Sequence, residues 1–524
     1  MVLKPRTIQK VKDHVSDSGI KDPIAQPLID QLLTLGKDLL KPDDSGVCQT
    51  AQEVENMLKV EVATARKVGF MNPLLDMEGL SGDIHLDTPT EILHTILLGV
   101  VKYFWAQSVF VLEKDKKLSL LESRLALVNT AGLDIPELNA AYICQYCGLL
   151  VGRHFKAIVQ VIPFVMYNLF AGNRHLISAW LLLGQMTSML WYTAIDDIDA
   201  YTDFLLVTAL CSPSIMILKP KFHFLVHLPG FIRRFGPALL FSTKRFESFN
   251  GVFRAASTFS NRQAPSRDIA RRFANIERAK HICSGGFWKE GGEWVCASPA
   301  IRAYPAKSTV FRSVRTCANP NVIPWMELVQ GVGASHLEAP GGCDNHYIQA
   351  VSMVSQSGDT KRAGSNILLQ DQSFGHVRAI FVHHFTNGDT VDYVLIERYI
   401  LAKQKHPLLD MPMVSQLGTL AYVPAVEVEC LVNLQHDCAT SQKCKCTKVT
   451  YKIQERERTS KALLCVNHSD QVQFIINIHA LHNSLQLRRA ISPELHLQKT
   501  LSLNKEEIFS TAVKKMKNNR AEKA

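Results

Sequence analysis

The sequence lacks the apolar segments that insert into or cross a membrane. Its first 19 residues have no apolar core, which argues against a signal peptide. The most apolar runs, residues 157–171 and 176–192, are shorter than the roughly 20 residues that a bilayer span requires. We therefore expect an intracellular protein with no membrane partner.

An organised cysteine framework is also missing. The chain has 13 cysteines in 524 residues, and an odd number scattered through a long chain favours a reducing compartment over secretion. Cys144 and Cys147 form a C-x2-C pair, but no partner pair accompanies them. We therefore interpret these two as core thiols and not as zinc ligands.

A large charge imbalance is absent from the chain as a whole but present in one segment. The formal net charge is only +10 over 524 residues. Residues 244–280 alone contain nine Lys or Arg against three Asp or Glu. Clustered cations of this kind suit an anionic partner, whereas a dispersed surplus affects little besides solubility.

Strand patterns are nearly absent from the first half of the chain. Apolar residues recur there at three- and four-residue spacing, which predicts helices. After Phe287 glycine and proline mark a boundary, alternating patterns follow, and Asn387-Gly388 between two of them predicts a β-hairpin. The sequence thus predicts an α+β fold. Its parts are a helical segment (1–70), a region (71–285) containing a helical block (118–218), a linker (286–323), a small β-rich, barrel-like domain (324–490) and a basic tail (491–524).

Acidic residues adjoin two of the ordered apolar patterns. Thr88 predicts the N-cap of a helix, with Asp87 and Glu91 at its start. Glu247 lies on the polar face of a second predicted helix, among cations. Such carboxylates can hold a divalent metal beside a phosphodiester. The alternatives are compensation of the helix dipole by the first two acids and simple neutralisation of Glu247 by nearby arginines.

Cations surround Glu247 and continue into the next predicted helix, which Ser266 can cap. Phosphate contacts from such side chains give affinity for nucleic acid without reading its sequence. A solvated helix face is the alternative interpretation. The candidate nucleic-acid-binding residues are Lys244, Arg245, Arg254, Arg262, Arg267, Arg271, Arg272 and Arg278.

Two histidine- or cysteine-containing groups could hold a metal. His223 and His227 have helical spacing for chelation, but their apolar neighbours favour packed histidines. The segment 436–446 offers enough sulfur and nitrogen for a structural zinc, and free thiols in a loop are the alternative. The candidate zinc ligands are Cys438, Cys444 and Cys446, with His436 or His468 as the fourth.

Four motifs follow one another in a fixed order along the chain. They are DTPTEILHTILLGVVKYFW (87–105), LVGRHFKAIVQVIPFVMYNL (150–169), KPKFHFLVHLPGFIRRFGP (219–237), and KRFESFNGVFR (244–254) followed by SNRQAPSRDIARRF (260–273). In these stretches the chain resembles fungal transposon-encoded proteins related to the CACTA transposases, of the Plavaka type. The resemblance extends from about residue 72 to residue 489.

The resemblance implies an RNase H-like core that holds two Mg²⁺ or Mn²⁺ ions with a set of two Asp and one Glu. An all-helical insertion would separate the second Asp from the Glu. Carried over, the final Glu is Glu247, and the second acid is Asp87, or Glu91 where the E-I-L-H stretch is matched instead. The family's first Asp lies on an upstream strand that has no counterpart here, so we expect only a partial RNase H-like core.

From these features we expect a nuclear, transposon-derived protein that binds DNA and does not cleave it by itself. The alternative from another class is a scaffold whose β-rich domain binds protein or chromatin partners. A third possibility is an active nuclease that takes its missing Asp from another polypeptide. The sequence does not indicate an oligomeric state.

Overall fold

The computed structural model describes most of the chain between residues 8 and 496. The described residues are 8–18, 22–42, 46–67, 86–167, 169–170, 174–202, 220–258, 260, 263–301, 314–316, 322–340, 346–355, 357–385, 390–437, 445–452, 460–467 and 473–496. For 8, 16–18, 174–175, 220, 245, 314–316, 346, 445–452 and 460–467 only the backbone is described.

The chain divides into two compact units, which we describe separately. Unit 1 comprises Met1–Thr90, Ser212–Gly236 and Glu506–Ala524, and unit 2 comprises Glu91–Cys211 and Pro237–Lys505. The described helices of unit 1 are α1 (Ile8–Ser18), α2 (Gln26–Asp38), α3 (Ala51–Lys67) and α11 (Pro220–Phe235). Helices α2 and α3 bury Leu28, Leu32, Val54 and Leu58 against one another, as their helical apolar spacing predicts.

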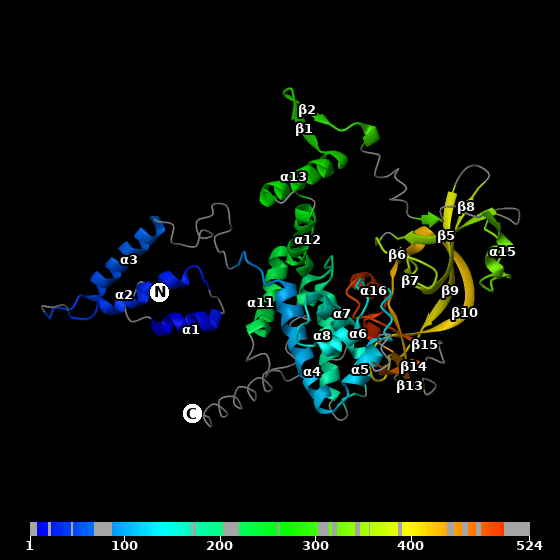
Figure 1. The fold of residues 1–524 in the computed structure, drawn as a ribbon, viewed down its shortest axis with the longest axis horizontal. Helices are drawn as coiled ribbons and strands as arrows, with labels where there is room; N and C mark the ends of the chain where they lie inside the picture. The colour runs from blue at the N-terminus through cyan, green and yellow to red at the C-terminus, as the bar shows by residue number, and fades with distance from the viewer. Residues whose placement is uncertain are drawn as a thin grey trace. The chain divides into compact units, whose positions relative to one another are not determined.

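Unit 2 begins with helices and continues into a sheet (Figure 1). Its helical elements include the π-helix η2 (Leu93–Val101), α4 (Lys102–Lys114), α5 (Leu118–Leu125), α6 (Ala140–Gln145), α7 (Gly152–Met166), α8 (Arg174–Leu190), the 3₁₀-helix η3 (Ala238–Phe241), α12 (Lys244–Thr258), α13 (Pro265–Cys283), α15 (Trp325–Gln330), the 3₁₀-helix η5 (Ala425–Glu427), α16 (Ser484–Ala490) and α17 (Pro493–His496). Before Phe287 the described residues contain no strand.

The described strands of unit 2 form one large antiparallel sheet and two hairpins. The hairpins are β1 (Phe287–Glu290) with β2 (Glu293–Cys296), and β13 (Lys445–Lys452) with β14 (Ser460–Asn467). The sheet runs in the order β11 (Val428–Leu431), β7 (Asn366–Leu369), β8 (Phe374–His384), β9 (Thr390–Leu401), β10 (Met413–Pro424), β15 (Gln473–Ile476) and β12 (Leu434–His436). Strand β5 (His346–Val354) pairs with β8 and carries β3 (Val314–Thr316), β4 (Val322–Pro324) and β6 (Thr360–Lys361).

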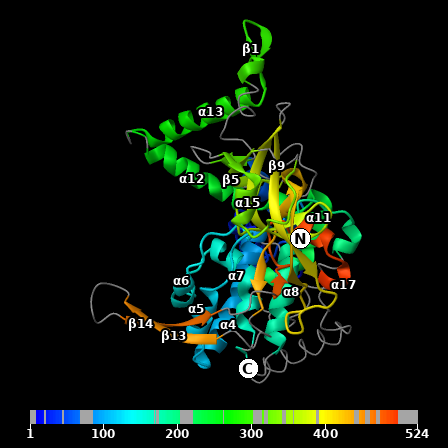
Figure 2. The ribbon, with the colours of Figure 1, turned by 90° about the vertical axis from the view of Figure 1, so that its right-hand side faces the viewer.

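The sheet curls until its two ends approach each other. Its end strands, β11 and β12, are consecutive in the chain and are joined by Val432 and Asn433 alone. So short a connection can span only about 10 Å at roughly 3.3–3.6 Å per residue. The two edges of the sheet must therefore lie close together, which gives the barrel-like curl seen in Figures 1 and 2.

The helical block and the sheet share one hydrophobic core. Phe164 of α7 and Leu181 of α8 are buried in the same cluster as Leu434, Ile475 and other strand residues. Sheet and helices are therefore parts of one unit, although the chain places the segment 286–323 between them.

A buried polar network connects the same two parts at the place where the sheet closes. The Asn433 amide donates to the Asn129 and Ala131 carbonyl oxygens, both at 2.8 Å. Asn477 Nδ2 donates to Asn433 Oδ1 at 2.9 Å and to the Gln160 carbonyl oxygen of α7 at 3.0 Å. Because buried amides cost free energy unless they are hydrogen-bonded, this network fixes the helical block against the sheet.

The predicted α+β class is confirmed. The helical first part and the curled antiparallel sheet in the second part both appear. Strands β8 and β9 form the predicted hairpin, with His384 opposite Thr390, and the Asn387-Gly388 turn lies outside the described residues. The segment predicted as a linker contains β1, β2 and β3 and the start of β4. The β1–β2 turn is Gly291-Gly292, both at positive φ, a conformation that glycine adopts without strain.

One described helical segment is longer than the runs singled out from the sequence. Leu93–Lys114, formed by η2 and α4, could cross a membrane by length and composition alone. Within unit 2, 61% of the most apolar stretch of this segment is buried. A helix in the core of a folded protein is likewise mostly buried. Its first nine residues form the π-helix, a rare backbone state that often marks functional sites.

Candidate functional site

Glu91 lies directly before the helical segment that contains the π-helix η2. Its carboxylate accepts hydrogen bonds from the backbone N–H groups of Leu93 at 2.7 Å and of His94 at 2.5 Å. It therefore satisfies donors that a helix start leaves without partners. The prediction that Thr88 caps this helix was wrong, because the helical segment starts at Ile92 and Glu91 supplies the cap.

Glu91 also contacts two side chains of unit 2. Its Oε1 lies 2.6 Å from His94 Nδ1, and its Oε2 accepts a hydrogen bond from Thr243 Oγ1 at 3.0 Å. Burial raises the pKa of this carboxyl group, but the hydrogen bonds from His94, Leu93 and Thr243 outweigh burial, and the pKa of Glu91 lies below its usual value. The carboxylate is thus held charged.

Glu247 lies on the other side of the same histidine. Its Oε1 is 3.6 Å from His94 Nε2, which is beyond hydrogen-bond distance. The Glu247 side chain is 54% exposed, compared with 13% for Glu91. Of the two candidates for the second acid, Glu91 is therefore the one that lies near Glu247, with His94 between them, within unit 2.

Asp87, the other candidate, belongs to unit 1. Its Oδ1 forms an ion pair with Arg234 Nη2 at the end of α11. The structure gives this carboxylate a cation as partner inside its own unit, which is consistent with neutralisation of charge.

These acids do not fit a two-metal site. Both oxygens of Glu91 are occupied by backbone and side-chain donors. Among the described residues no group of three or more His, Cys, Asp or Glu is arranged to hold a metal ion. We therefore derive no catalytic step through Mg²⁺ or Mn²⁺.

Helices α12 and α13 carry the predicted basic cluster. They pack on each other through aromatic rings, with Phe273 of α13 5.9 Å from Phe249 and 5.6 Å from Phe253 of α12. In Figure 2 α12 leads into α13, and the β1–β2 hairpin follows. None of the 19 residues of α13 is buried. This helix is therefore a surface element along its whole length.

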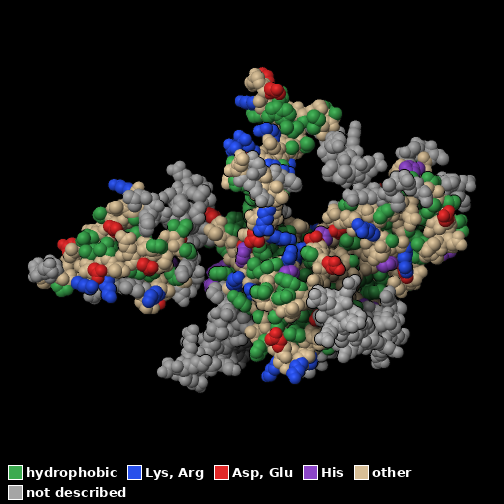
Figure 3. Space-filling model, viewed as in Figure 1, with side chains coloured by type: hydrophobic (Ala, Val, Ile, Leu, Met, Phe, Trp, Pro, Cys, Tyr) green, Lys and Arg blue, Asp and Glu red, His purple; other side chains and the backbone are tan. Residues whose placement is uncertain are grey.

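Three arginines of α13 share one side of the helix. At 3.6 residues per turn, Arg267, Arg271 and Arg278 lie within about 40° of one another, and Phe273 is roughly on the opposite side. All three are exposed, and Figure 3 shows Lys and Arg side chains gathered over α12 and α13. In the described part of the chain none of the three forms an ion pair, whereas Lys280 is paired with Glu277 at 2.7 Å.

The other predicted cations are placed differently. Arg272 is exposed on α13 but outside this stripe, and Arg254 is exposed on α12. Lys244, at the start of α12, lies near Lys156 of α7. The backbone of Arg245 belongs to α12, its side chain is not described, and Arg262 lies outside the described residues.

The predicted metal-binding groups are only partly described. His223 and His227 of α11 approach each other, with 3.1 Å between their Nε2 atoms, and His227 is exposed and not packed in a core. Burial, and then the neighbouring His223, lower the pKa of His227. Cys438, Cys444 and His468 lie outside the described residues, and for Cys446 only the backbone, in β13, is described.

Comparison with protein families identifies a match in the second half of the chain. Residues 310–496 match a family described as Domain of unknown function (DUF8590). We call this range the DUF8590 region. It contains the large curled sheet, the β13–β14 hairpin and helices α16 and α17, and leaves α12 and α13 outside. Neither the comparison with curated proteins nor that with solved structures yields a match.

Sequence reasoning missed His94 and Thr243 as neighbours of the acids. The spacing of Glu91 and His94, three residues apart at a helix start, was a signal for the first contact, since such residues are neighbours on a helix. Thr243 is 152 residues from Glu91, and no local pattern indicates that contact.

Proposed function

We propose that this protein binds DNA through the exposed arginines of α13 and derives from a transposase-like ancestor whose cleavage activity it no longer has by itself. The resemblance of the four ordered motifs supports the ancestry and, with it, a nuclear location. The observation that carries the binding proposal is the stripe formed by Arg267, Arg271 and Arg278 on a helix without a buried residue.

The geometry of the stripe suits a phosphate backbone. Arg267 and Arg278 are 11 residues apart, or about 16 Å along the axis at 1.5 Å per residue. One DNA strand presents about five phosphates over that length at 3.4 Å spacing. Arginine donates to phosphate in a bidentate manner, so three arginines can each contact a separate phosphate. Such contacts give affinity and no sequence preference.

The first test compares variants of the full chain for binding to a labelled duplex of arbitrary sequence. For each phosphate contact, log K falls by roughly 0.9 when the salt concentration rises tenfold. Each contact therefore makes the affinity at 0.1 M salt about eightfold higher than at 1 M salt. We therefore expect Arg267→Ala with Arg271→Ala to weaken binding about 60-fold in fluorescence anisotropy.

The matched control removes two exposed lysines from another helix. Lys102→Ala with Lys114→Ala on α4 changes the net charge equally, and both residues are exposed. We expect this control to bind DNA nearly as the unmodified protein does. Equal loss in both double variants would show that only net charge matters and would remove α13 as the interface. No binding by any of them would favour the scaffold function instead.

We further propose that the chain has no strand-cleaving activity of its own. The support is that Glu91 caps a helix with both carboxylate oxygens engaged. Incubation of supercoiled DNA with the protein and Mg²⁺ or Mn²⁺ should give no nicked product. Metal-dependent nicking that disappears in Glu247→Gln would contradict this proposal and leave the binding proposal standing.

A further inference from the structure

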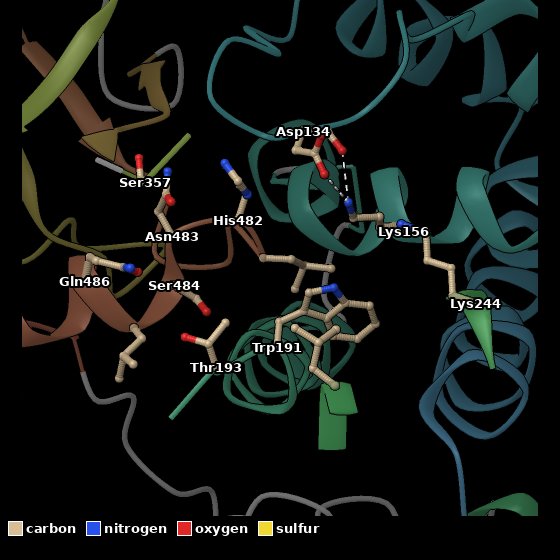
Figure 4. Close-up of a pocket in the computed structure, with 13 residues that line it drawn as sticks. Asp134, Lys156, Trp191, Thr193, Lys244, Ser357, His482, Asn483, Ser484 and Gln486 are labelled. Carbon is tan, nitrogen blue, oxygen red and sulfur yellow. Dashed lines mark hydrogen bonds and ion pairs between the residues drawn. The ribbon is translucent and has the colours of Figure 1, made fainter. Parts of the chain in front are cut away.

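Unit 2 contains a cavity of about 300 Å³ between the helical block and the DUF8590 region (Figure 4). Its walls come from α7, from the residues after α8, from η3 and the start of α12, and from the segment that leads into α16. The volume is at the lower end of the range of small-molecule sites. The cavity is separate from the arginine stripe of α13.

One wall of the cavity carries two lysines. Lys156 is only 7% exposed and donates to the Asp134 carbonyl oxygen at 2.9 Å and to Asp134 Oδ2 at 3.0 Å. An ammonium group has three donors, so one remains for a ligand. In Figure 4 Lys244 reaches from α12 toward Lys156. Among the described lining residues these two lysines face one carboxylate, Asp134.

The proximity of the two ammonium groups is electrostatically unfavourable without an anion. Burial, and then the charge of Lys156, lower the pKa of Lys244, and Asp134 opposes this only in part. An anion between the two lysines would relieve the repulsion. Like charges held together in a cavity are therefore a reason to expect a negatively charged occupant.

The opposite wall supplies further donors. His482 is hydrogen-bonded through Nε2 to the buried carboxylate of Asp359, and in the described part of the chain its Nδ1 has no hydrogen bond. The hydrogen bond that His482 donates to Asp359 raises the pKa of His482, which favours its cationic form. Ser484 is 3% exposed and also lines the cavity, and its buried Oγ has no hydrogen-bond partner among the described residues. Because protein atoms cover this oxygen, the donor that this wall offers to a ligand is His482.

The Asp359 carboxylate holds this wall in place. It accepts hydrogen bonds from the Leu431 backbone at 2.8 Å, from Asn483 Nδ2 at 2.7 Å and from Ser357 Oγ at 3.0 Å. Asn483 has a φ of 59°, a left-handed conformation that is uncommon outside glycine and that asparagine tolerates best. His482 is thus presented by a segment that these hydrogen bonds hold in place.

An aromatic ring completes the site. The indole of Trp191 lines the cavity below the lysines in the view of Figure 4, and flat ligand rings stack on such faces. We propose that this cavity binds a phosphate monoester, with a nucleoside monophosphate as the occupant that its size and its aromatic wall admit. The phosphate lies among Lys156, Lys244 and His482.

Calorimetric titration of the full chain tests this proposal with adenosine monophosphate, adenosine and inorganic phosphate in sulfate-free buffer. We expect the monophosphate to bind at least tenfold more tightly than adenosine, since the charged contacts belong to the phosphate. Lys244→Ala should weaken the monophosphate about tenfold. Its side chain is exposed, so the variant should keep the thermal stability of the unmodified protein.

Controls separate this site from the arginine stripe. Lys102→Ala, and Arg267→Ala with Arg271→Ala, should bind the monophosphate like the unmodified protein. Equal affinity for monophosphate and adenosine, undiminished binding in Lys244→Ala, or no heat with millimolar monophosphate and phosphate would overturn the proposal.

A second arm identifies the source of the phosphate. This experiment titrates a tetranucleotide with a 5′-phosphate, the same tetranucleotide without it, and adenosine monophosphate. If the 5′-phosphorylated tetranucleotide binds more tightly than the monophosphate, the natural ligand is a DNA end. If the monophosphate binds more tightly, the natural ligand is a free nucleotide.

Discussion

Helix α13 and strand β9 are both regular elements of unit 2, but they relate to the rest of the protein in opposite ways. Strand β9 buries Val394, Leu395 and Ile396 on both faces of the sheet. Helix α13 buries none of its 19 residues. Stability therefore resides in the sheet and its shared core with α7 and α8, whereas α13 is free to present charge.

The largest expected effect concerns the core. Phe381 is fully buried and lies 5.4 Å from Trp325 and 5.6 Å from Tyr347, measured between ring centroids. Phe381→Ala should lower the free energy of unfolding by about 3–5 kcal/mol. Phe246 of α12 is 73% exposed, and Phe246→Ala should change the free energy of unfolding by less than about 0.5 kcal/mol. Urea denaturation checks both, and similar losses would contradict the contrast between core and surface.

The next effect concerns the Asp359–His482 pair. The Asp359 side chain is 4% exposed, and its hydrogen bonds would be partly lost in Asp359→Asn. We expect the free energy of unfolding to fall by about 2 kcal/mol at pH 6, as for a hydrogen bond to a charged group. No measurable change would mean that the carboxylate does not organise this segment.

The pair also has a defined pH dependence. Because the pKa of His482 is raised in the folded protein, its protonation stabilises the fold. This stabilisation is fully present below about pH 6.5, the pKa of histidine in the unfolded chain, and is lost as pH rises through the pKa of the folded state. The pKa of Asp359 is lowered by its hydrogen bonds from His482, Leu431 and Asn483, which outweigh burial. The contribution of the Asp359 carboxylate to stability is fully present above about pH 4, and it is lost as pH falls below that value. The difference between the unmodified protein and Asp359→Asn should therefore be largest between about pH 4 and pH 6.5.

Other titrating groups do not disturb this comparison. Burial lowers the pKa of His479 to about 3 and that of His496 to about 4, so both destabilise the fold as pH falls below about 6.5. They are unchanged in Asp359→Asn and cancel in the difference. A difference that grows above pH 7 would contradict the assigned pairing.

A smaller contrast distinguishes the two glutamates. Glu91→Ala removes the cap of η2 and should cost about 1–2 kcal/mol of stability. Glu247→Ala removes a carboxylate that is 54% exposed and should cost less than about 0.5 kcal/mol. Thermal or urea unfolding of the two variants measures the contrast. A larger loss in Glu247→Ala would show that Glu247 has a structural role.

Local patterns predicted the elements that local forces form. The helical block, the β8–β9 hairpin and α13 follow from periodicity and turn residues. Helix α13 begins at Pro265 and not after a Ser266 cap, because proline at the first helical position is already set for the helix. The β1–β2 hairpin was missed, although Gly291-Gly292 between two short apolar runs was a usable signal.

The remaining features depend on contacts that are distant in sequence. The closure of the sheet rests on Asn433 and its bonds to Asn129, 304 residues earlier. The cavity collects Lys156, Lys244 and Ser484 from three separated segments. Each residue alone has an ordinary surface or helix pattern, so only the folded chain brings them together.

The salt dependence of DNA binding tests the central claim most directly. If Arg267, Arg271 and Arg278 each contact a phosphate, the log–log slope of affinity against salt should be about −2.7 or steeper. The triple alanine variant should reduce its magnitude by about 2.7, and the Lys102→Ala with Lys114→Ala control should keep it unchanged. A slope near zero, or the same slope in the triple variant, would contradict the account.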